Sequence, residues 1–456
     1  MEYSDLKYLL VDLPGDIRKL KEAGDFSRMK RVINMRLNDE KTPLPMRRRL
    51  ELELAMDEML DSVYPYEQAD AEKIMDDTIT DFKPEELEYY RDIDAADWIY
   101  VDGRVRFRRN FMSNLIKTRS EIYDRLKNKS RIENDSRESA MLDSTIMKMM
   151  EKGEAVYRFR VRATAQVKPE FYRPGKVVRV HIPVPIEYSQ MENVRIISCS
   201  PEPRHIAAPD YPQRTVCFEG VYPQETVFTV EYEYVNHVRY VKPDPSKVLP
   251  TQPKFYTEEL EPHIVFKPYL KELVKDIIGS ETNPLVKARL IYDWVTENIN
   301  YSFMPPYFVV DDLTGFMTTR RKGDCGMYAL TFITLCRIAG VPARWQSGLE
   351  VSPMAVGMHD WAQFYVAPYG WLYTDCSFGS SAVRNGNDMR REFYFGNLDP
   401  FRMCAASEFQ HEFDPPKKYM RYDPYDNQDG EAEYEDMRLL NTQIYTDQEV
   451  IEWEEL

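Results

Sequence analysis

The sequence predicts an α+β protein of several domains, and three patterns indicate this. Residues 1 to about 150 repeat apolar side chains at helical spacing. From Tyr157 onward, apolar and polar residues alternate as they do in β-strands. After a proline-rich stretch at 242–253, one strongly apolar helix is followed by two strand-like runs. We therefore expect a mostly helical domain of unknown role (1–150), a β-sandwich (151–242), an α+β core (254–410) and an acidic C-terminal tail (411–456).

The composition is that of a globular protein with an acidic surface. The formal net charge is −16, which argues against a nucleic acid or an anionic membrane as partner. No run approaches the length of apolar residues that a membrane span needs, and the N-terminus has no signal-peptide pattern. The six cysteines show neither paired nor metal-type spacing. We expect a cytoplasmic protein without a metal or organic cofactor.

The N-terminal part reads as helices with one hairpin. Pro45 suits the first turn of a helix, and apolar residues then recur from Leu52 to Val63 at helical intervals. Two strand-like runs flank Asp102-Gly103, which predicts a tight two-residue hairpin turn at this position. Nothing in this part indicates an activity.

The middle of the chain reads as short antiparallel strands. The predicted strands are separated by Pro, Gly and Asn, which is typical of a β-sandwich. They lie at 157–162, 177–184, 194–199, 214–219 and 226–234. The proline-rich stretch that follows reads as an extended linker, and Asn283-Pro284 predicts the start of a helix that runs to Asn298.

Cys325 is the first candidate for chemistry. It precedes an apolar run from Met327 to Ala339, which predicts a buried helix that ends at Gly340. We expect Cys325 at the first turn, facing a cleft, where the helix dipole favours a thiolate. The neighbouring Asp324 opposes that effect. A single cysteine in such a place is also often just a small buried apolar residue.

Two further residues turn this thiol into a candidate nucleophile. His359 begins a strand-like run, and Asp375 ends the next one, with turn residues Pro368-Tyr369-Gly370 between the runs. In an antiparallel hairpin, His359 and Asp375 would lie side by side. A base near the thiol and a carboxylate that orients the base are the requirements of a catalytic triad.

The segments around these residues resemble the transglutaminase-like superfamily. The resemblance is carried by Gly323-Asp324-Cys325-Gly326 with Arg337–Arg344, by His359-Asp360-Trp361, and by Trp371–Asp375; the helix at Tyr292–Tyr301 is similar to the one before the cysteine in bacterial members. The resemblance covers about residues 283–380. It implies a papain-like fold with Cys325 as nucleophile, His359 as base and Asp375 as orienting residue. Gln363 departs from the pattern, because an acidic residue is frequent there.

The sequence leaves three functions open. Many bacterial members of the family are thought to be peptidases or amidases, so we expect hydrolysis of an amide in a peptide or protein substrate through a thioester intermediate. A protein-glutamine acyltransferase is the alternative if an amine replaces water, and a silent interaction module is the third. For the oxyanion, the N–H of Cys325 is one expected donor and Tyr301 is a guess for the second. The sequence does not settle the oligomeric state.

The acidic C-terminal end has two readings. From Asn427 to Leu456, ten acidic residues accompany one basic residue, Arg438. We expect a solvated end or a short helix. Occupation of the cleft by this end, as self-regulation, is the alternative.

Overall fold

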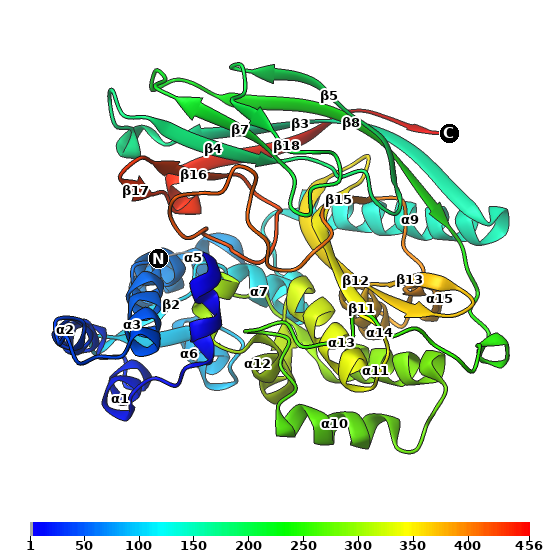
Figure 1. Ribbon diagram of the computed structural model, residues 1–456, viewed down its shortest axis with the longest axis horizontal. Helices are drawn as coiled ribbons and strands as arrows, with labels where there is room; N and C mark the ends of the chain where they lie inside the picture. The colour runs from blue at the N-terminus through cyan, green and yellow to red at the C-terminus, as the bar shows by residue number, and fades with distance from the viewer. Residues whose placement is uncertain (1–2) are drawn as a thin grey trace. The chain divides into compact units, whose positions relative to one another are not determined.

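The computed structural model describes residues 3–456 (Figure 1). The chain forms two compact units. Unit 1 combines Met1–Arg137 with Asn300–Asp311, and unit 2 combines Glu138–Ile299 with Asp312–Leu456. The division therefore falls earlier than the expected boundary near residue 150, because the long helix α9 (Lys129–Lys152) contributes to both units.

Unit 1 is mostly helical, as its sequence pattern predicts. Its elements are η1 (Tyr3–Leu10), α1 (Gly15–Glu22), α2 (Phe26–Leu37), α3 (Leu44–Asp57), α4 (Leu60–Val63), α5 (Gln68–Thr78), α6 (Pro84–Asp92), β1 (Trp98–Val101), β2 (Arg104–Phe107), α7 (Phe111–Thr118), α8 (Ser120–Tyr123), β9 (Asn300–Tyr301) and η4 (Tyr307–Val309). The hairpin expected at Asp102-Gly103 is formed, with φ of 49° and 83° at these residues. Positive φ at both turn residues is what a type I′ turn requires.

Unit 2 contains two antiparallel sheets in the region predicted as a β-sandwich. One sheet has the order β18-β3-β8-β5 and the other β17-β16-β4-β7-β6. The strands are β3 (Glu154–Val167), β4 (Val178–Pro183), β5 (Met191–Ser200), β6 (His205–Ile206), β7 (Thr215–Gly220), β8 (Phe228–Arg239), β16 (Glu431–Tyr434), β17 (Met437–Arg438) and β18 (Ile444–Glu455). Buried side chains from both sheets form one hydrophobic cluster. Short 3-10 turns occur at η2 (Pro169–Phe171), η3 (Pro245–Lys247) and η5 (Asn441–Gln443).

The C-terminal end corrects our expectation of an acidic tail. β18 pairs with β3 from Ile444 to Glu455, and β16 pairs with β4. On the exposed face, acidic residues of β18 meet arginines of β3; Arg162, for example, bonds Glu449 at 2.7 Å. The negative charges that suggested a solvated end are therefore one side of a charge-matched strand pair.

The remainder of unit 2 is a five-stranded sheet covered by helices. The strand order is β14-β13-β12-β11-β15. The elements are α10 (Pro268–Ile278), α11 (Pro284–Asn298), α12 (Leu313–Arg320), β10 (Lys322–Gly323), α13 (Cys325–Ile338), β11 (Ala343–Val351), β12 (Val356–Val366), β13 (Gly370–Thr374), α14 (Cys376–Arg384), α15 (Asp388–Phe393), β14 (Phe395–Gly396) and β15 (Arg402–Ala406). Asn283 caps α11 by accepting a hydrogen bond from the N–H of Leu285, as expected.

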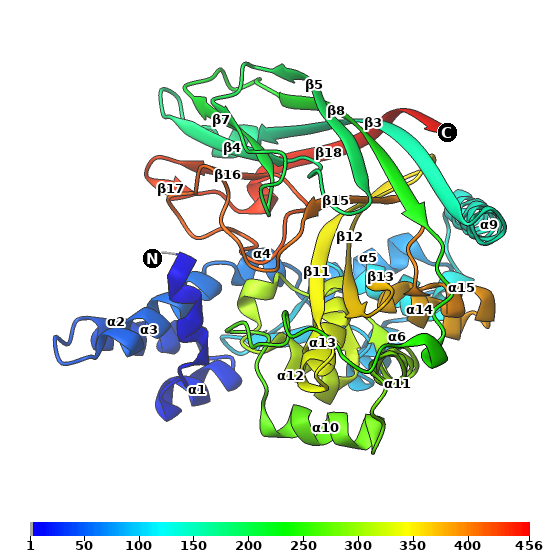
Figure 2. The same ribbon diagram turned by 45° about the vertical axis from the view of Figure 1, so that its right-hand side comes forward.

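The two faces of this sheet have different neighbours. Helix α13 packs on β11 and β12, with α11 and α14 against it (Figures 1 and 2). On the other face, Trp361 joins the hydrophobic cluster of the two-sheet region. The two-sheet region and the five-stranded sheet therefore share one core. Both domains that the sequence predicts here lie within this single compact unit.

Candidate active site

Cys325 lies at the first turn of helix α13. The preceding residue, Asp324, is the N-cap, and its carboxylate accepts a hydrogen bond from the N–H of Met327 at 3.4 Å. Nearly every residue of α13 is buried, which explains its apolar sequence. Cys325 itself is 9% exposed, so the thiol is nearly enclosed rather than open to a cleft.

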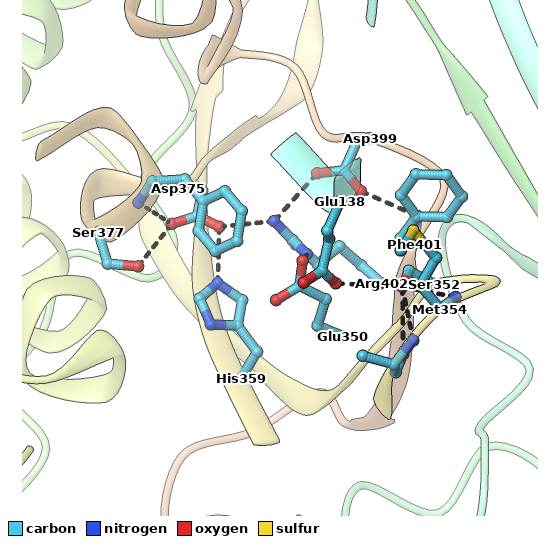
Figure 3. Close-up of polar contacts among 12 residues, drawn as sticks. Glu138, Glu350, Ser352, Met354, His359, Asp375, Ser377, Asp399, Phe401 and Arg402 are labelled. Carbon is cyan, nitrogen blue, oxygen red and sulfur yellow. Dashed lines mark hydrogen bonds and ion pairs between the residues drawn. The ribbon is translucent and has the colours of Figure 1, made fainter. Parts of the chain in front are cut away.

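His359 and Asp375 meet across the β12–β13 pair. The two strands are antiparallel, with Ala362 opposite Thr374. This register places His359 Nε2 2.7 Å from Asp375 Oδ2 (Figure 3). His359 is 5% exposed and Asp375 is fully buried. The prediction that these two residues lie side by side is therefore met in the structure.

Asp375 is held by more than the histidine. Its Oδ1 accepts hydrogen bonds from the Ser377 hydroxyl at 2.9 Å and from the N–H of Phe378 at 3.0 Å, so Asp375 is also the N-cap of α14. Burial by itself raises the pKa of Asp375, but His359 and then Arg402 outweigh it and lower the pKa to about 2. The carboxylate is thus ionised at neutral pH, although it is buried.

The thiol of Cys325 forms its hydrogen bond with Asp360, the residue after His359. The distance from Cys325 Sγ to Asp360 Oδ2 is 3.4 Å. The backbone of Asp360 also hydrogen-bonds the sulfur, so the thiol lies at the start of β12, next to the peptide that follows His359. Successive side chains of a strand point to opposite faces. The carboxylate of Asp360 and the imidazole of His359 therefore leave β12 in opposite directions.

The expected thiolate is not favoured in this arrangement. Burial raises the pKa of the Cys325 thiol well above its usual value, and the negative charges of Asp360 and Asp324 raise it further. We expected the start of the helix to favour the thiolate. Desolvation and two neighbouring carboxylates outweigh that effect, because a helix dipole contributes only a fraction of a kcal/mol to about 2 kcal/mol.

Asp360 is a buried member of a group of carboxylates near the thiol. Gln428 Nε2 donates to Asp360 Oδ1 at 2.6 Å. Burial raises the pKa of Asp360 well above its usual value, with further contributions from Asp324 and Asp423. Gln428 lies in the acidic end for which self-regulation was the alternative reading, and that end therefore does contact a neighbour of Cys325.

Arg402 completes the surroundings of Asp375 (Figure 3). Its Nη2 lies 3.3 Å from Asp375 Oδ2 and 3.0 Å from Asp399 Oδ2, and its Nη1 lies 3.3 Å from Glu350 Oε1. The side chain is fully buried, and its guanidinium carbon is 4.2 Å from the centre of the Phe378 ring. Phe378 also packs edge-on against His359.

Tyr301, the guessed second oxyanion donor, belongs to unit 1. It is 7% exposed, its ring packs edge-on against Phe303, and Lys117 Nζ lies 3.9 Å from its ring centre. Its role as an oxyanion donor stays a prediction. Gln363, the departure from the family pattern, bonds Arg344 at 2.8 Å and Ser189 at 3.2 Å.

Two features are absent from the part of the chain that the structure describes. Within residues 3–456, no group of three or more His, Cys, Asp or Glu side chains is arranged to hold a metal ion. Among the helices of the same residues, none combines the length and apolar character needed to cross a lipid bilayer.

Sequence reasoning missed the roles of Asp360 and Arg402. A signal for Asp360 existed, because strand alternation at His359-Asp360-Trp361 places one of the two polar residues on the helix-facing side. For Arg402 no local signal exists. It lies 27 residues after Asp375 in sequence, and only the pairing of β15 with β11 brings it beside that carboxylate.

Comparison with known proteins gives a family match for part of the α+β core. The family model described as the Transglutaminase-like superfamily matches residues 271–376. The matched segment includes Cys325, His359 and Asp375. The chain thus carries a transglutaminase-like segment in its α+β core.

Two curated relatives match about a quarter of the chain. An uncharacterized protein of Haemophilus influenzae is 31% identical over 137 residues, which are 25% of this chain and 37% of the relative. A protein-glutamine gamma-glutamyltransferase of Pseudomonas aeruginosa is 25% identical over 122 residues, which are 24% of this chain and 18% of the relative. The chain therefore spans less than half the length of these relatives.

Solved structures give weaker similarity. A candidate cysteine protease from Cytophaga hutchinsonii aligns over 66% of this chain and 91% of its own, with 16% identity and a TM-score of 0.38. The periplasmic domain of TgpA from Pseudomonas aeruginosa aligns over 54% of this chain and 95% of its own, with 15% identity and a TM-score of 0.28.

Proposed function

We propose that the protein is a cysteine-dependent hydrolase of amide or peptide bonds, with Cys325 as nucleophile, His359 as base and Asp375 as orienting residue. The hydrogen bond between His359 and Asp375 supports this most directly. It is formed inside the segment that matches the family model, in the strands that follow the helix bearing Cys325. A base oriented by a buried carboxylate is the part of a triad that a chance arrangement rarely supplies.

In this proposal the two ring nitrogens of His359 have different tasks. Nε2 is bound to Asp375, so Nδ1 is the nitrogen left to accept the proton of the thiol. The sulfur meets the backbone of Asp360, which directly follows His359 in β12. In the structure the thiol is hydrogen-bonded to Asp360, on the opposite face of β12 from the His359 imidazole. The proposed reaction therefore requires the thiol and the imidazole to rotate toward each other as substrate binds, after which the thiol transfers its proton to Nδ1.

The thiolate then attacks the amide carbonyl, and a tetrahedral oxyanion forms. First-turn N–H groups of a helix have no partner within the helix, so the N–H of Cys325 can donate to this oxygen. His359 returns its proton to the departing amine, which leaves a thioester on Cys325. Water, deprotonated by His359, hydrolyses the thioester and restores the thiol.

Acyl transfer is the second candidate, and one relative favours it. The Pseudomonas aeruginosa relative is named a protein-glutamine gamma-glutamyltransferase. In that reaction the same thioester would form on Cys325 from a glutamine side chain, and a primary amine rather than water would take the acyl group. The first half of the reaction is shared, so the two candidates differ only in the second substrate.

Alkylation of the native protein by iodoacetamide at several pH values tests the triad. We expect one thiol to react faster than the others, Cys325→Ala to remove that reaction, and His359→Ala to slow it near neutral pH. Cys217→Ala is a matched control, because Cys217 is a buried cysteine whose pKa burial also raises. If Cys325 reacts no faster than Cys217, the protein is an interaction module and the enzyme proposal fails.

The second substrate needs a separate measurement. The protein is incubated with a peptide library, with and without a primary amine, and products are identified by mass spectrometry. Hydrolysis predicts cleaved or deamidated peptides in both samples. Transfer predicts amine adducts only where the amine is present, and that result would replace the hydrolase proposal.

We also propose a cellular location and a substrate class for the protein. All six cysteines are unpaired in the structure, which is compatible with the proposed cytoplasmic, reducing location. We propose a peptide or protein as substrate. The acidic net charge argues against a nucleic acid or a membrane surface as partner.

A further inference from the structure

Arg402 is a buried cation without a place in the proposed reaction. It begins strand β15, outside residues 271–376, and it is fully buried. Within the described residues, its Nε has no hydrogen-bond partner, and its Nη1 has only the ion pair with Glu350 at 3.3 Å. A buried guanidinium with unsatisfied donors costs free energy, and buried ion pairs are weak evidence for stability. Stability alone therefore does not explain this residue.

The fold holds Arg402 from several elements. Asn236 of β8 donates to the backbone carbonyl of Arg402 at 2.8 Å. Glu350 of β11 is its cross-strand neighbour. Asp399 binds its Nη2 and is itself held by the Tyr394 hydroxyl at 2.8 Å and the N–H of Phe401 at 2.9 Å. The guanidinium consequently has one position, and that position faces Asp375.

The charges around Asp375 show what this cation does. Without Arg402, burial would oppose the ionisation of Asp375. Asp399 and Glu350 would then lie nearby without the cation with which they pair. Three groups would still favour the ionised form of Asp375: His359 and two neutral donors, the Ser377 hydroxyl and the N–H of Phe378. The phenols Tyr292 and Tyr394 also face this region. Among these groups, Arg402 keeps its positive charge regardless of pH, because an arginine stays protonated in proteins.

We propose that Arg402 is a positioning residue of this site: held by Asp399 and Glu350, its guanidinium keeps Asp375 ionised, and Asp375 thereby orients His359. The inference rests on the proposed function, because Arg402 affects the reaction only through His359. Loss of the charge leaves Asp375 free to take a proton, and a protonated carboxyl no longer stabilises the imidazolium that forms during thiol activation.

The first test follows the carboxyl carbon of Asp375 by NMR in full-length Cys325→Ala protein labelled with ¹³C-aspartate. Asp375→Asn assigns the signal. We expect no titration between about pH 4 and 7 with Arg402 present, and a titration within that range in Arg402→Met. This result does not depend on activity. If the signal of Arg402→Met stays unchanged over this range, the inference is overturned.

Two variants guard against a merely structural effect. Arg49→Met is the matched control, because Arg49 is a 1% exposed arginine paired with Glu53 at 2.8 Å in unit 1; it should leave the Asp375 signal unchanged. Asp399→Asn removes the charge of a nearby carboxylate but keeps a side-chain oxygen that can accept from Nη2 of Arg402, so it should not bring the titration into range. If Arg402→Met fails to fold, Arg402→Gln replaces it, and a titration in Asp399→Asn would also contradict the proposal.

The second test is a double-mutant comparison of Cys325 alkylation at neutral pH. We expect Arg402→Met to slow the reaction about tenfold or more, Arg402→Lys to restore part of it, and Arg402→Met to add nothing in an Asp375→Asn background. Additive losses would show that Arg402 acts independently of Asp375. If alkylation does not depend on His359 at all, the proposed function fails, while the NMR result still decides whether Arg402 controls Asp375.

Discussion

At the scale of the residue, the thiol and the imidazole of this site have different partners. Cys325 is hydrogen-bonded to Asp360, and His359 to Asp375. Asp375 is ionised because a histidine and an arginine face it, whereas Asp360 has other carboxylates as neighbours. In the proposed function the first carboxylate orients the base, and the second raises the pKa of the thiol.

Asp360→Asn should make Cys325 more reactive. The substitution keeps the size of the side chain and removes the carboxyl group that hydrogen-bonds the thiol and raises its pKa. If the pKa falls by about one unit, the thiolate fraction at neutral pH rises about tenfold. Iodoacetamide alkylation between pH 6 and 9 measures this. Asp324→Asn should act in the same direction but more weakly, since Asp324 contributes less. Slower alkylation of Asp360→Asn would instead identify Asp360 as a base for the thiol.

At the scale of the element, strand β11 links the residues around the site. It pairs with β12 on one side, where Gly348 is opposite His359, and with β15 on the other, where Glu350 is opposite Arg402. A Cβ at Gly348 would lie 2.1 Å from the carbonyl oxygen of Met403. The absence of a side chain at residue 348 is therefore what allows β15 to approach β11.

Gly348→Ala should destabilise the protein by about 1–3 kcal/mol, because the methyl group forces β11 and β15 apart. It should also slow Cys325 alkylation, since Arg402 moves with β15. Urea unfolding and the alkylation rate measure the two effects. Gly357→Ala is the control: residue 357 is on β12, and no atom lies within 4 Å of the added Cβ. Equal losses of stability in both variants would contradict the role assigned to Gly348.

At the scale of the whole molecule, unit 2 contains buried carboxylates of two kinds. The pKa of Asp375 and of Glu431 is lowered to about 2 despite burial, because cations face both. Burial raises the pKa of Asp423 to about 6 and that of Asp360 and Asp426 well above the usual value. The first kind stabilises the fold above about pH 4 and loses this effect toward about pH 2. The second kind stabilises it fully only below about pH 4, and the effect is lost as pH rises through the folded-state pKa.

The protein should therefore be most stable near about pH 4–5 and should lose stability as the pH rises toward 7. Asp423→Asn removes one group of the second kind, so it should reduce this loss, by about 2 kcal/mol if Asp423 alone accounts for the difference. Urea unfolding at pH 5 and pH 7.5 measures the change. Asp447→Asn, on the exposed strand β18, is the control and should leave the pH dependence as it is. Equal pH dependence in all three proteins would contradict the assignment to buried carboxylates.

Much of the site was predictable because its determinants are local. The apolar run after Cys325 predicts a buried helix, and α13 is that helix. Turn residues between two alternating runs predict the β12–β13 hairpin, which brings His359 to Asp375. The acidic end was misread for a physical reason: its charges face arginines on β3, which are almost 300 residues away in sequence.

The sequence by itself determined which element carries each residue: a thiol at a helix start, an imidazole on one strand and a carboxylate directly after the next. Periodicity and turn chemistry are sufficient for that, since they act over a few residues. His359 is the fourth residue of β12 rather than its first, because the strand already begins at Val356. Only the tertiary structure decided which charged and hydrogen-bonding groups face each of these residues. The partner of the thiol, the cation beside Asp375 and the pairing of the acidic end all depend on strand pairing and burial, which join residues far apart in the chain.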